Sequence, residues 1–306
     1  MSGTLNGRVA LVTGGGRGIG RAIAEALHQA GAAVVIADNG TSIAGIGADL
    51  TVAESLAQAL GERAAAFGES IAAPSAAKAA VDFAVGRFGG LDILVNNAAI
   101  LRDAFVFKAD PGDWEAVLRT NLFAPFYTIA AAALVLRDQA KAKRGGGAWG
   151  RIVNLVSTAG FYGNYGQAAY AASKAGLTGL TRVTALDLAR SQVACNAIAP
   201  FAATRVTESI KPQNPAQQAY KDTAMKIPAR PVADLVTYLA GDAGAAITGQ
   251  LFGVRGREVF LLSQSRPAAK AVAKTPDGIG AAMAALAPHF VALETDLEAF
   301  ANQPVL

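Results

Sequence analysis

The sequence predicts an α/β fold built on a doubly wound parallel sheet, as a single domain with a C-terminal helical extension. Short apolar, β-branched runs alternate with Ala-rich stretches of helical periodicity along most of the chain. Most of the apolar runs are continuous, without the polar alternation of a half-exposed strand. Strands buried on both faces are typical of parallel sheets that carry helices on each side.

Six runs are predicted as strands, in the order Arg8–Thr13, Ala33–Ala37, Leu91–Asn96, Arg151–Val156, Val193–Ala199 and Gln250–Val254. Between the first two, apolar residues recur at helical spacing from Ile19 to Leu27, and Gly31 supplies a stop. A strand, a helix and a second strand within about thirty residues make a βαβ unit. A glycine-bearing loop at 41–47 and a helix at 51–61 follow it.

The composition excludes several classes of protein. Of 306 residues, 52% are hydrophobic and 16% charged, which is too apolar for a disordered chain. The 33 glycines follow no Gly-X-Y period, so a collagen is excluded as well. No internal repeat or Pro/Ser linker divides the chain. We therefore expect one domain over residues 1–256 and an extension over 257–306, which packs on the domain or contacts another subunit.

The positive net charge of +4 does not indicate nucleic-acid binding. The excess lies in two stretches, Arg137–Arg151 and Arg205–Arg230, each of which has a single aromatic residue and no nucleic-acid motif. These stretches are either solvated loops or a face for an anionic substrate tail. His28 and His289 lie far from any metal-ligand spacing, so no metal site is expected.

The sequence also favours a cytoplasmic protein without a membrane span. Cys195 is the single cysteine and lies in an apolar run, as a buried structural thiol would. The N-terminus reaches the first strand without a signal-peptide core. The apolar stretch between Arg119 and Arg137 is short for a span and contains Asn121 and Pro125, so a buried helix is predicted there.

A glycine cluster joins the first strand to the first helix, Thr13-Gly-Gly-Gly-Arg17-Gly-Ile-Gly20. Glycines let the backbone turn sharply and approach a pyrophosphate that faces the helix N-terminus, as in Rossmann-type domains. Asp38 ends the second strand, 18 residues past Gly20, where a carboxylate accepts the ribose hydroxyls of NAD and repels a 2′-phosphate. NAD is the expected cofactor, and Arg17 keeps NADP as the alternative.

A second motif pairs Tyr170 with Lys174, which share one helix face at the i, i+4 spacing. A phenol needs its pKa lowered by about 3 units to act as a base near pH 7. An ammonium beside it, together with a positive nicotinamide ring, would supply that shift. On its own, such a pair is more often a helical tyrosine and a solvated lysine.

Together the two motifs resemble the short-chain dehydrogenase/reductase family over about residues 5–256, the predicted dinucleotide-binding and catalytic domain. The family's glycine turn is matched by Gly14, Gly18 and Gly20, and its NNAG segment by Asn96-Asn97-Ala98-Ala99, with alanine in place of the last glycine. Its catalytic residues match Asn121, Ser157, Tyr170 and Lys174, and Ser157 precedes Tyr170 by the usual 13 residues.

The resemblance implies an NAD(P)-dependent exchange of hydride between a secondary alcohol and a ketone. Ser157 would orient the substrate oxygen, Tyr170 would exchange its proton, Lys174 would hold the nicotinamide ribose, and Asn121 would fix a relay water. The implied substrate residues are Phe161, Tyr162, Asn164 and Phe201. The implied cofactor residues are Gly14, Arg17, Gly18, Ile19, Gly20, Asp38, Glu69, Ser70, Asn97, Ala98, Pro200 and Thr204.

Within the family, the segments Ile100–Asp103 and Tyr162–Gln167 resemble the (3R)-hydroxyacyl-CoA dehydrogenase and hydroxysteroid dehydrogenase subgroup. A 3-hydroxyacyl-CoA substrate is therefore expected, with hydroxysteroids and 3-ketoacyl-carrier-protein reduction as rivals and a non-catalytic dinucleotide sensor as a further alternative.

Two expectations concern the surface. Residues 207–231 should form a substrate lid, with Arg205, Lys211 and Lys221 facing an anionic carrier. The resemblance also implies a homo-oligomer, a tetramer or dimer, assembled through the helix around 114–136 and the last helix and strand.

Overall fold

In the computed structural model, one sheet of eight strands runs through the molecule in the order β3-β2-β1-β4-β5-β6-β7-β8. The structure describes residues 4–144, 149–209, 212, 215–273, 275–301 and 305. The first seven strands pair in parallel and β8 pairs with β7 antiparallel. The strand order reverses between β1 and β4, and α/β domains of this type bind ligands beyond the carboxyl ends of the strands at such a point.

The strands are β1 (Val9–Thr13), β2 (Ala33–Ala37), β3 (Ala64–Phe67), β4 (Ile93–Asn96), β5 (Gly150–Leu155), β6 (Val193–Phe201), β7 (Leu251–Arg255) and β8 (Glu258–Leu261). The helices of the domain are α1 (Gly18–Gln29), α2 (Thr51–Leu60), α3 (Pro74–Phe88), α4 (Pro111–Leu118), α5 (Ala124–Lys141), α6 (Ala159–Tyr162), α7 (Ala168–Asp187), α8 (Arg205–Ser209), α9 (Pro215–Ala224) and α10 (Arg230–Ala240). The extension adds α11 (Ile279–Leu286) and α12 (Asp296–Ala301).

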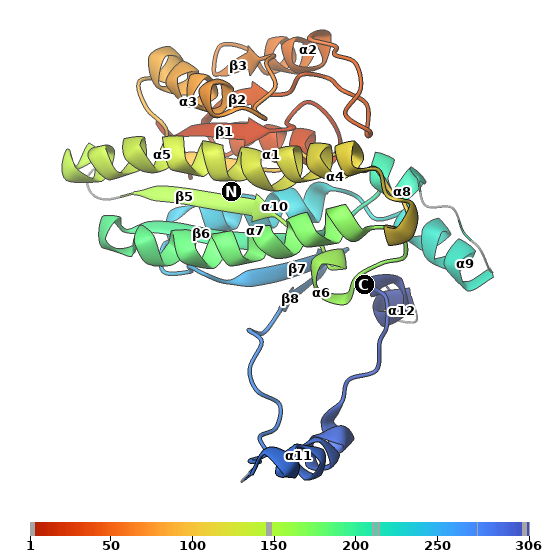
Figure 1. Ribbon diagram of the computed structural model, residues 1–306. Helices are drawn as coiled ribbons and strands as arrows, with labels where there is room; N and C mark the ends of the chain where they lie inside the picture. The colour runs from red at the N-terminus through yellow and green to blue at the C-terminus, as the bar shows by residue number, and fades with distance from the viewer. Residues whose placement is uncertain are drawn as a thin grey trace.

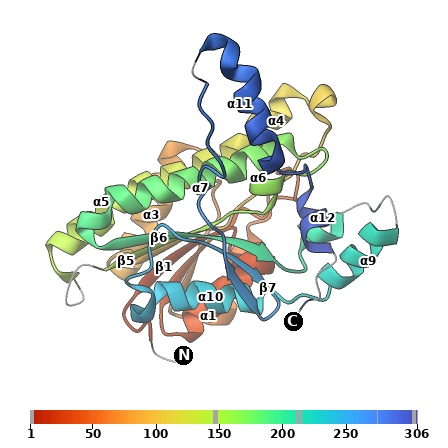
Figure 2. The ribbon, with the colours of Figure 1, turned by 90° about the horizontal axis from the view of Figure 1, so that it is seen from below.

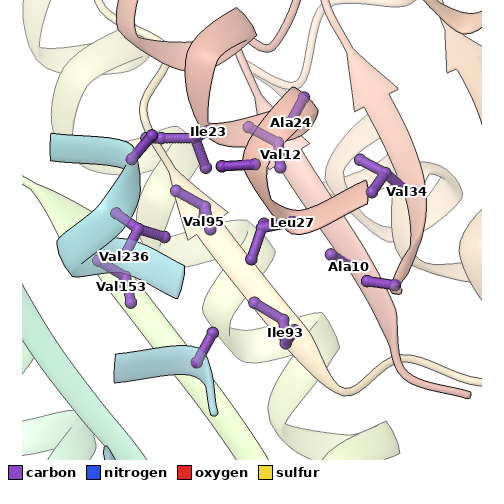
Figure 3. Packing of buried hydrophobic residues seen from close by; sticks show 14 of the residues in the cluster. Ala10, Val12, Ile23, Ala24, Leu27, Val34, Ile93, Val95, Val153 and Val236 are labelled. Carbon is purple, nitrogen blue, oxygen red and sulfur yellow. The ribbon is translucent and has the colours of Figure 1, made fainter. Parts of the chain in front are cut away.

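Helices cover both faces of the sheet, as the continuous apolar strands predict. On one face α1 packs beside α10, and on the other α3, α5 and α7 lie along the strands (Figures 1 and 2). Figure 3 shows Ile23 and Leu27 of α1 and Val236 of α10 meeting Val12 of β1 and Val153 of β5. All five side chains are almost fully buried. This apolar contact fixes the N-terminal end of α1 beside the end of β1.

Two strands were missed by the sequence-based prediction. The run 64–67 is mostly alanine, so β3 lacks the β-branched signal of its neighbours. The strand β8 follows a tight turn at Gly256, whose φ is +59°. The sheet therefore extends one strand past the expected domain boundary at residue 256, and the extension is not helical throughout.

The helical run Pro111–Lys141 joins α4, a π-helical turn (Arg119–Phe123) and α5. By length and composition alone it could cross a membrane, with a mean hydropathy of 1.2. Core helices of globular proteins meet the same criteria. Here Thr128, Ala132 and Leu136 are buried and α5 packs against α3, while Phe126 and Leu134 are exposed. The run is thus a covering helix of the sheet with one free apolar face.

After β8 the chain leaves the domain, forms α11 at the tip of a projecting arm, and returns to place α12 against α6 and α9 (Figures 1 and 2). No residue of α11 is buried, and Ile279 and Met283 are exposed. The helical part of the expected extension is thus α11, which ends at Leu286, together with α12.

Candidate active site

The glycine turn after β1 has the backbone geometry that a phosphate-binding loop needs. Gly14 and Gly18 have φ of +61° and +54°, a region that residues with a Cβ rarely adopt. A Cβ on Gly14 would lie 2.8 Å from Cα of Ala98, and one on Gly20 would lie 2.0 Å from the Gly14 carbonyl oxygen. The three glycines therefore let α1 begin directly against the loop, with its N-terminus facing the ligand.

Hydrogen bonds between Thr13, at the end of β1, and Asn97, just after β4, hold this turn in place. The Asn97 side chain donates to the carbonyl oxygens of Thr13 and Gly14, at 3.1 and 2.9 Å. In return, the Thr13 hydroxyl accepts from the backbone N–H groups of Asn97 and Ala98. Asn97 thus shapes the cofactor loop through hydrogen bonds to it, a contact that the NNAG resemblance does not specify.

Asp38 stands at the carboxyl end of β2, with both carboxylate oxygens oriented by the backbone. Oδ2 accepts from the N–H of Gly16 at 2.9 Å and Oδ1 from that of Gly40 at 2.8 Å. Two guanidiniums lie nearby, and each donates to a loop carbonyl: Arg17 to Gly40 and Arg205 to Thr41. The Arg17 Nε is buried and has no hydrogen-bond partner among the described residues.

A cavity of about 520 Å³ opens at this edge of the sheet. All twelve residues that the sequence assigns to the cofactor line it, and so do Tyr170 and Lys174. The loop after β2 contributes Ile43 and Gly45, whose role the sequence does not reveal. Because the glycine turn, the Asp38 carboxylate and the Tyr170–Lys174 pair share one cavity, these residues fit an extended dinucleotide.

The Tyr170–Lys174 pair lies on α7 at the wall of the cavity. Lys174 is 3% exposed, its Nζ donates to the Leu155 carbonyl oxygen at 2.7 Å, and it lies 5.7 Å from the Tyr170 ring centre. Lys174 is therefore a buried lysine and not the solvated one that such a spacing more often indicates. The carbonyl at the end of β5 fixes the ammonium beside the phenol.

Burial sets the protonation of this pair in the protein by itself. It raises the pKa of Tyr170 to about 12, opposed by a side-chain hydrogen bond with Ser157 and reinforced by the charges of Asp296 and Asp103. Burial also lowers the pKa of Lys174 to about 8. The lowered phenol pKa expected from the sequence depends on a bound nicotinamide ring as well as on the lysine, so it stays a prediction. In the protein by itself, burial has the largest effect on the pKa of Tyr170.

Ser157 and Asn121, the other two expected catalytic residues, do not line the cavity that Tyr170 and Lys174 line. Ser157 is half-buried after β5, where its Oγ accepts from the N–H of Ala159 at 3.2 Å. Asn121 is fully buried in the π-helical turn, and its side chain exchanges two hydrogen bonds with the backbone of Ile100, at 2.8 and 2.9 Å. The amide of Asn121 is thus engaged in holding the segment after β4.

The sequence profile of the short chain dehydrogenase family matches residues 8–217. The chain belongs to the short-chain dehydrogenase family. It is 39% identical over 259 residues to the hydroxyacyl-CoA dehydrogenase ChsB1 of Mycobacterium tuberculosis, covering 85% of this chain and 80% of that protein. It is 38% identical to a 3-oxoacyl-[acyl-carrier-protein] reductase of Aquifex aeolicus, covering 82% and 97%.

A crystal structure of a short chain dehydrogenase from Mycobacterium avium has the same fold. The TM-score is 0.79 at 34% sequence identity, and the match covers 96% of this chain and 99% of that one. With these relatives, the short-chain dehydrogenase described here is an oxidoreductase acting on CH–OH groups, in a family that binds NAD(P).

The four residues expected to contact substrate lie together but outside the described cavity. Phe161 is exposed at the surface of α6. Phe201 is buried against Phe260 and Phe300, and Tyr162 packs edge-on against Phe300. The side chain of Asn164 donates to that of Gln167 at 3.1 Å. Their contact with substrate stays a prediction. Three of them contact the C-terminal segment: Tyr162 and Phe201 pack on Phe300, and the Asn164 side chain hydrogen-bonds Asp296.

Of the three basic residues expected to face an anionic carrier, the structure describes Arg205 and Lys221. Arg205 lines the cofactor cavity, with Arg17 and Asp38 as its charged neighbours. The Nζ of Lys221 donates to the carbonyl oxygen of Glu208 at 2.7 Å. Lys211 lies outside the described residues. The expected lid region folds into α8, α9 and the start of α10.

Cys195 is buried, and burial raises the pKa of its thiol. This matches the expectation of a structural cysteine. Among the residues that the structure describes, no group of three or more His, Cys, Asp or Glu side chains is placed to hold a metal ion.

Proposed function

We propose that this chain is an NAD-dependent dehydrogenase that interconverts a 3-hydroxyacyl-CoA and the corresponding 3-ketoacyl-CoA. The observation that carries the proposal is the shared cavity: the Tyr170–Lys174 pair lies at one part of its wall and the oriented carboxylate of Asp38 at another. A dinucleotide whose phosphates lie on the glycine turn would extend between them.

The preference for NAD rests on Asp38. Backbone N–H groups hold both of its oxygens, so the carboxylate presents a fixed negative charge where a 2′-phosphate would lie. The nearby Arg17 and Arg205 are the observation in favour of NADP. Each of them already donates to a loop carbonyl, which leaves fewer of its N–H groups for a phosphate.

The protonation state of Tyr170 supports a proton transfer from its phenol to the substrate oxygen. With its pKa raised to about 12, Tyr170 holds its proton at neutral pH and is suited to donate it to a carbonyl oxygen in the reduction direction. Ser157, hydrogen-bonded to the phenol, would orient the same oxygen. When bound, the nicotinamide accepts or supplies the hydride, and its oxidised form adds positive charge that favours the phenolate.

In the oxidation direction Tyr170 acts as the base, so its pKa must fall from the value in the protein alone. Lys174 is placed to assist, because its ammonium is held near the ring by the Leu155 carbonyl. Asn121 supports the same site through its side-chain amide, which holds the Ile100 backbone, so a relay water at Asn121 would bind to the main chain of Asn121.

The substrate class is supported by the similarity to the hydroxyacyl-CoA dehydrogenase of Mycobacterium tuberculosis. The second candidate is reduction of a 3-oxoacyl group on a carrier protein, favoured by the nearly equal similarity to the Aquifex aeolicus reductase. Hydroxysteroids remain a third class for the same pocket.

Steady-state assays with 3-hydroxybutyryl-CoA, a 3-oxoacyl carrier protein, a hydroxysteroid and a short secondary alcohol separate these candidates when each is run with NAD(H) and NADP(H). We expect the highest kcat/KM for the acyl-CoA with NAD. Equal efficiency for the acyl-CoA and the short alcohol would refute recognition of CoA, and a preference for the carrier protein with NADPH would establish the second candidate.

We further propose that the protein is a homo-oligomer, a dimer or tetramer. The free face of the Pro111–Lys141 run carries exposed Trp114, Phe126 and Leu134, and α7 adds exposed Val183 and Leu186. Burial of such apolar side chains favours association. Sedimentation equilibrium measures the state directly, and a monomer at micromolar concentration would refute the proposal.

A further inference from the structure

The C-terminal segment returns to the catalytic side of the domain after its excursion through α11. Figures 1 and 2 show α12 beside α6 and α9, although more than 130 residues separate α12 from α6. The helix α6 begins two residues after Ser157. The returning segment is therefore in contact with the turn that presents the catalytic serine.

An aromatic contact anchors this segment. Phe300 is 8% exposed, and its ring lies 4.9 Å from that of Phe201, 5.7 Å from Tyr162 and 5.8 Å from Phe260. Its backbone carbonyl accepts from the Arg255 guanidinium at 3.2 Å. These contacts join the segment to β6, α6, β7 and β8, so it is docked on the domain.

A polar contact then reaches the residue next to the catalytic serine. The Thr158 hydroxyl donates to Oδ2 of Asp296 at 2.9 Å. The backbone N–H of Asp296 donates to the Gly163 carbonyl at 3.3 Å. Asp296 thus holds both ends of α6, the short helix between Thr158 and Gly163.

The Thr158 side chain bonds to Asp296 and does not cap α6. It occupies the N-cap position of α6, where a threonine side chain normally accepts from a backbone N–H of the first turn. No such bond is present, and the hydroxyl is directed to Asp296 instead. The Thr158 backbone carbonyl accepts from the N–H groups of Phe161 and Tyr162, so a shift of Thr158 would move the whole turn.

The turn in question determines where the Ser157 hydroxyl lies. Oγ of Ser157 accepts from the N–H of Ala159, inside the segment that Asp296 fixes at its two ends. Asp296 is also close enough to act on Tyr170, whose pKa its charge raises. Ser157 and Tyr170 are thus both within the influence of one carboxyl group from the far end of the chain.

We propose that Asp296 is a positioning residue of the reaction, which holds Thr158, and through it Ser157, in place for the substrate oxygen. The inference rests on the catalytic roles proposed for Ser157 and Tyr170. It gives the C-terminal extension a function at the active site of its own chain. What the proposal requires of residue 296 is an oxygen atom that accepts from the Thr158 hydroxyl. The negative charge of Asp296 is not required.

The test compares four single variants in the full-length protein: Asp296→Ala and Thr158→Val, which break the contact, and Asp296→Asn and Thr158→Ser, which keep it. Turnover is measured with NAD and 3-hydroxybutyryl-CoA, or with whichever secondary alcohol the wild type oxidises best. We expect kcat to fall about tenfold or more in the first pair while KM for NAD is unchanged. The second pair should stay within about threefold of wild type.

The double variant Thr158→Val with Asp296→Ala adds a readout of coupling. If the two side chains act through one hydrogen bond, the double variant is no slower than the slower single variant. Additive losses, wild-type kcat in Asp296→Ala, or an Asp296→Asn variant as slow as Asp296→Ala would each overturn the proposal. The Thr158→Val variant keeps Asp296 and the whole tail, so it remains informative should Asp296→Ala fold poorly.

Failure of the Asp296 proposal can be told apart from failure of the proposed substrate or mechanism. A wild type that ignores acyl-CoA but oxidises another alcohol removes the substrate proposal and leaves the Asp296 test intact. A Tyr170→Phe variant that keeps its turnover removes the mechanism whatever Asp296 does.

Discussion

The ammonium of Lys174 lies 5.7 Å from the centre of the Tyr170 ring and is held there by the carbonyl oxygen at the end of β5. The contact joins a strand end to a helix that covers the sheet, so the fold itself sets the distance between the two groups. In the protein alone, burial keeps the phenol protonated and weakens the proton affinity of the lysine. Catalysis in the oxidation direction therefore requires added positive charge near the phenol.

Lys174 makes the stability of the protein depend on pH. Burial lowers its pKa from 10.5 to about 8, so between these values the unfolded chain keeps a proton that the folded protein has released. The free energy of unfolding should consequently rise with pH from about 8 to 10. Lys174→Met should remove a contribution on the order of 3 kcal/mol from this dependence.

Chemical denaturation of the wild type and Lys174→Met at pH 7, 8, 9 and 10 checks this prediction. The free energy of unfolding of the wild type should rise relative to that of Lys174→Met as pH increases from 8 to 10. A difference that is constant over the whole range would contradict the burial of a charged lysine as its cause.

Asp38 should control the choice of cofactor. Asp38→Ser removes the negative charge and leaves Arg17 and Arg205 beside the ribose site. We expect kcat/KM for NADP to rise about tenfold or more and that for NAD to fall, since about 1.4 kcal/mol of repulsion corresponds to tenfold. Asp82→Ser, on the exposed face of α3, is the matched control and should change neither value. Unchanged selectivity in Asp38→Ser would mean that this carboxylate does not face the ribose.

Gly20 should tolerate no side chain. A Cβ there would lie 2.0 Å from the Gly14 carbonyl oxygen, so Gly20→Ala must displace the turn from α1. We expect NAD(P) binding by calorimetry to be lost and the unfolding free energy to drop by about 2 kcal/mol or more. The control is Gly179→Ala on the exposed face of α7, where a Cβ meets nothing within 4 Å. That variant should be stabilised by about 0.5–1 kcal/mol.

Much of the fold was predictable because its signals are local. Continuous apolar runs mark β1, β2, β4, β5, β6 and β7. The strand β3 was missed because alanine has little strand preference, and β8 because its side chains alternate between half-buried and exposed beyond the expected boundary. Both strands lie at the edges of the sheet and both bear on the site: the chain leaving β3 brings Glu69 and Ser70 to the cavity, and Phe260 of β8 packs against Phe201.

The residues assigned to the cofactor were predictable for the same reason. A glycine turn and an acid at the end of a strand can both be recognised from a few neighbouring residues. Contacts across long stretches of sequence were not. Nothing in residues 290–301 indicates that Asp296 meets Thr158, and nothing around Asn121 shows that its amide would be taken up by Ile100. The spacing of Tyr170 and Lys174 likewise reveals that the two side chains are neighbours but not how far both are buried, and burial is what raises the pKa of Tyr170 in the protein by itself.

The most direct test of the proposed chemistry is the turnover of Tyr170→Phe with NAD and the best acyl-CoA substrate, measured beside its NAD dissociation constant. Removal of the phenolic hydroxyl leaves the ring in place and takes away the group that exchanges the proton. We expect kcat to fall by about 100-fold or more, with NAD affinity within about threefold of wild type. Turnover retained within tenfold of wild type would contradict the assignment of Tyr170 as the proton-transfer residue.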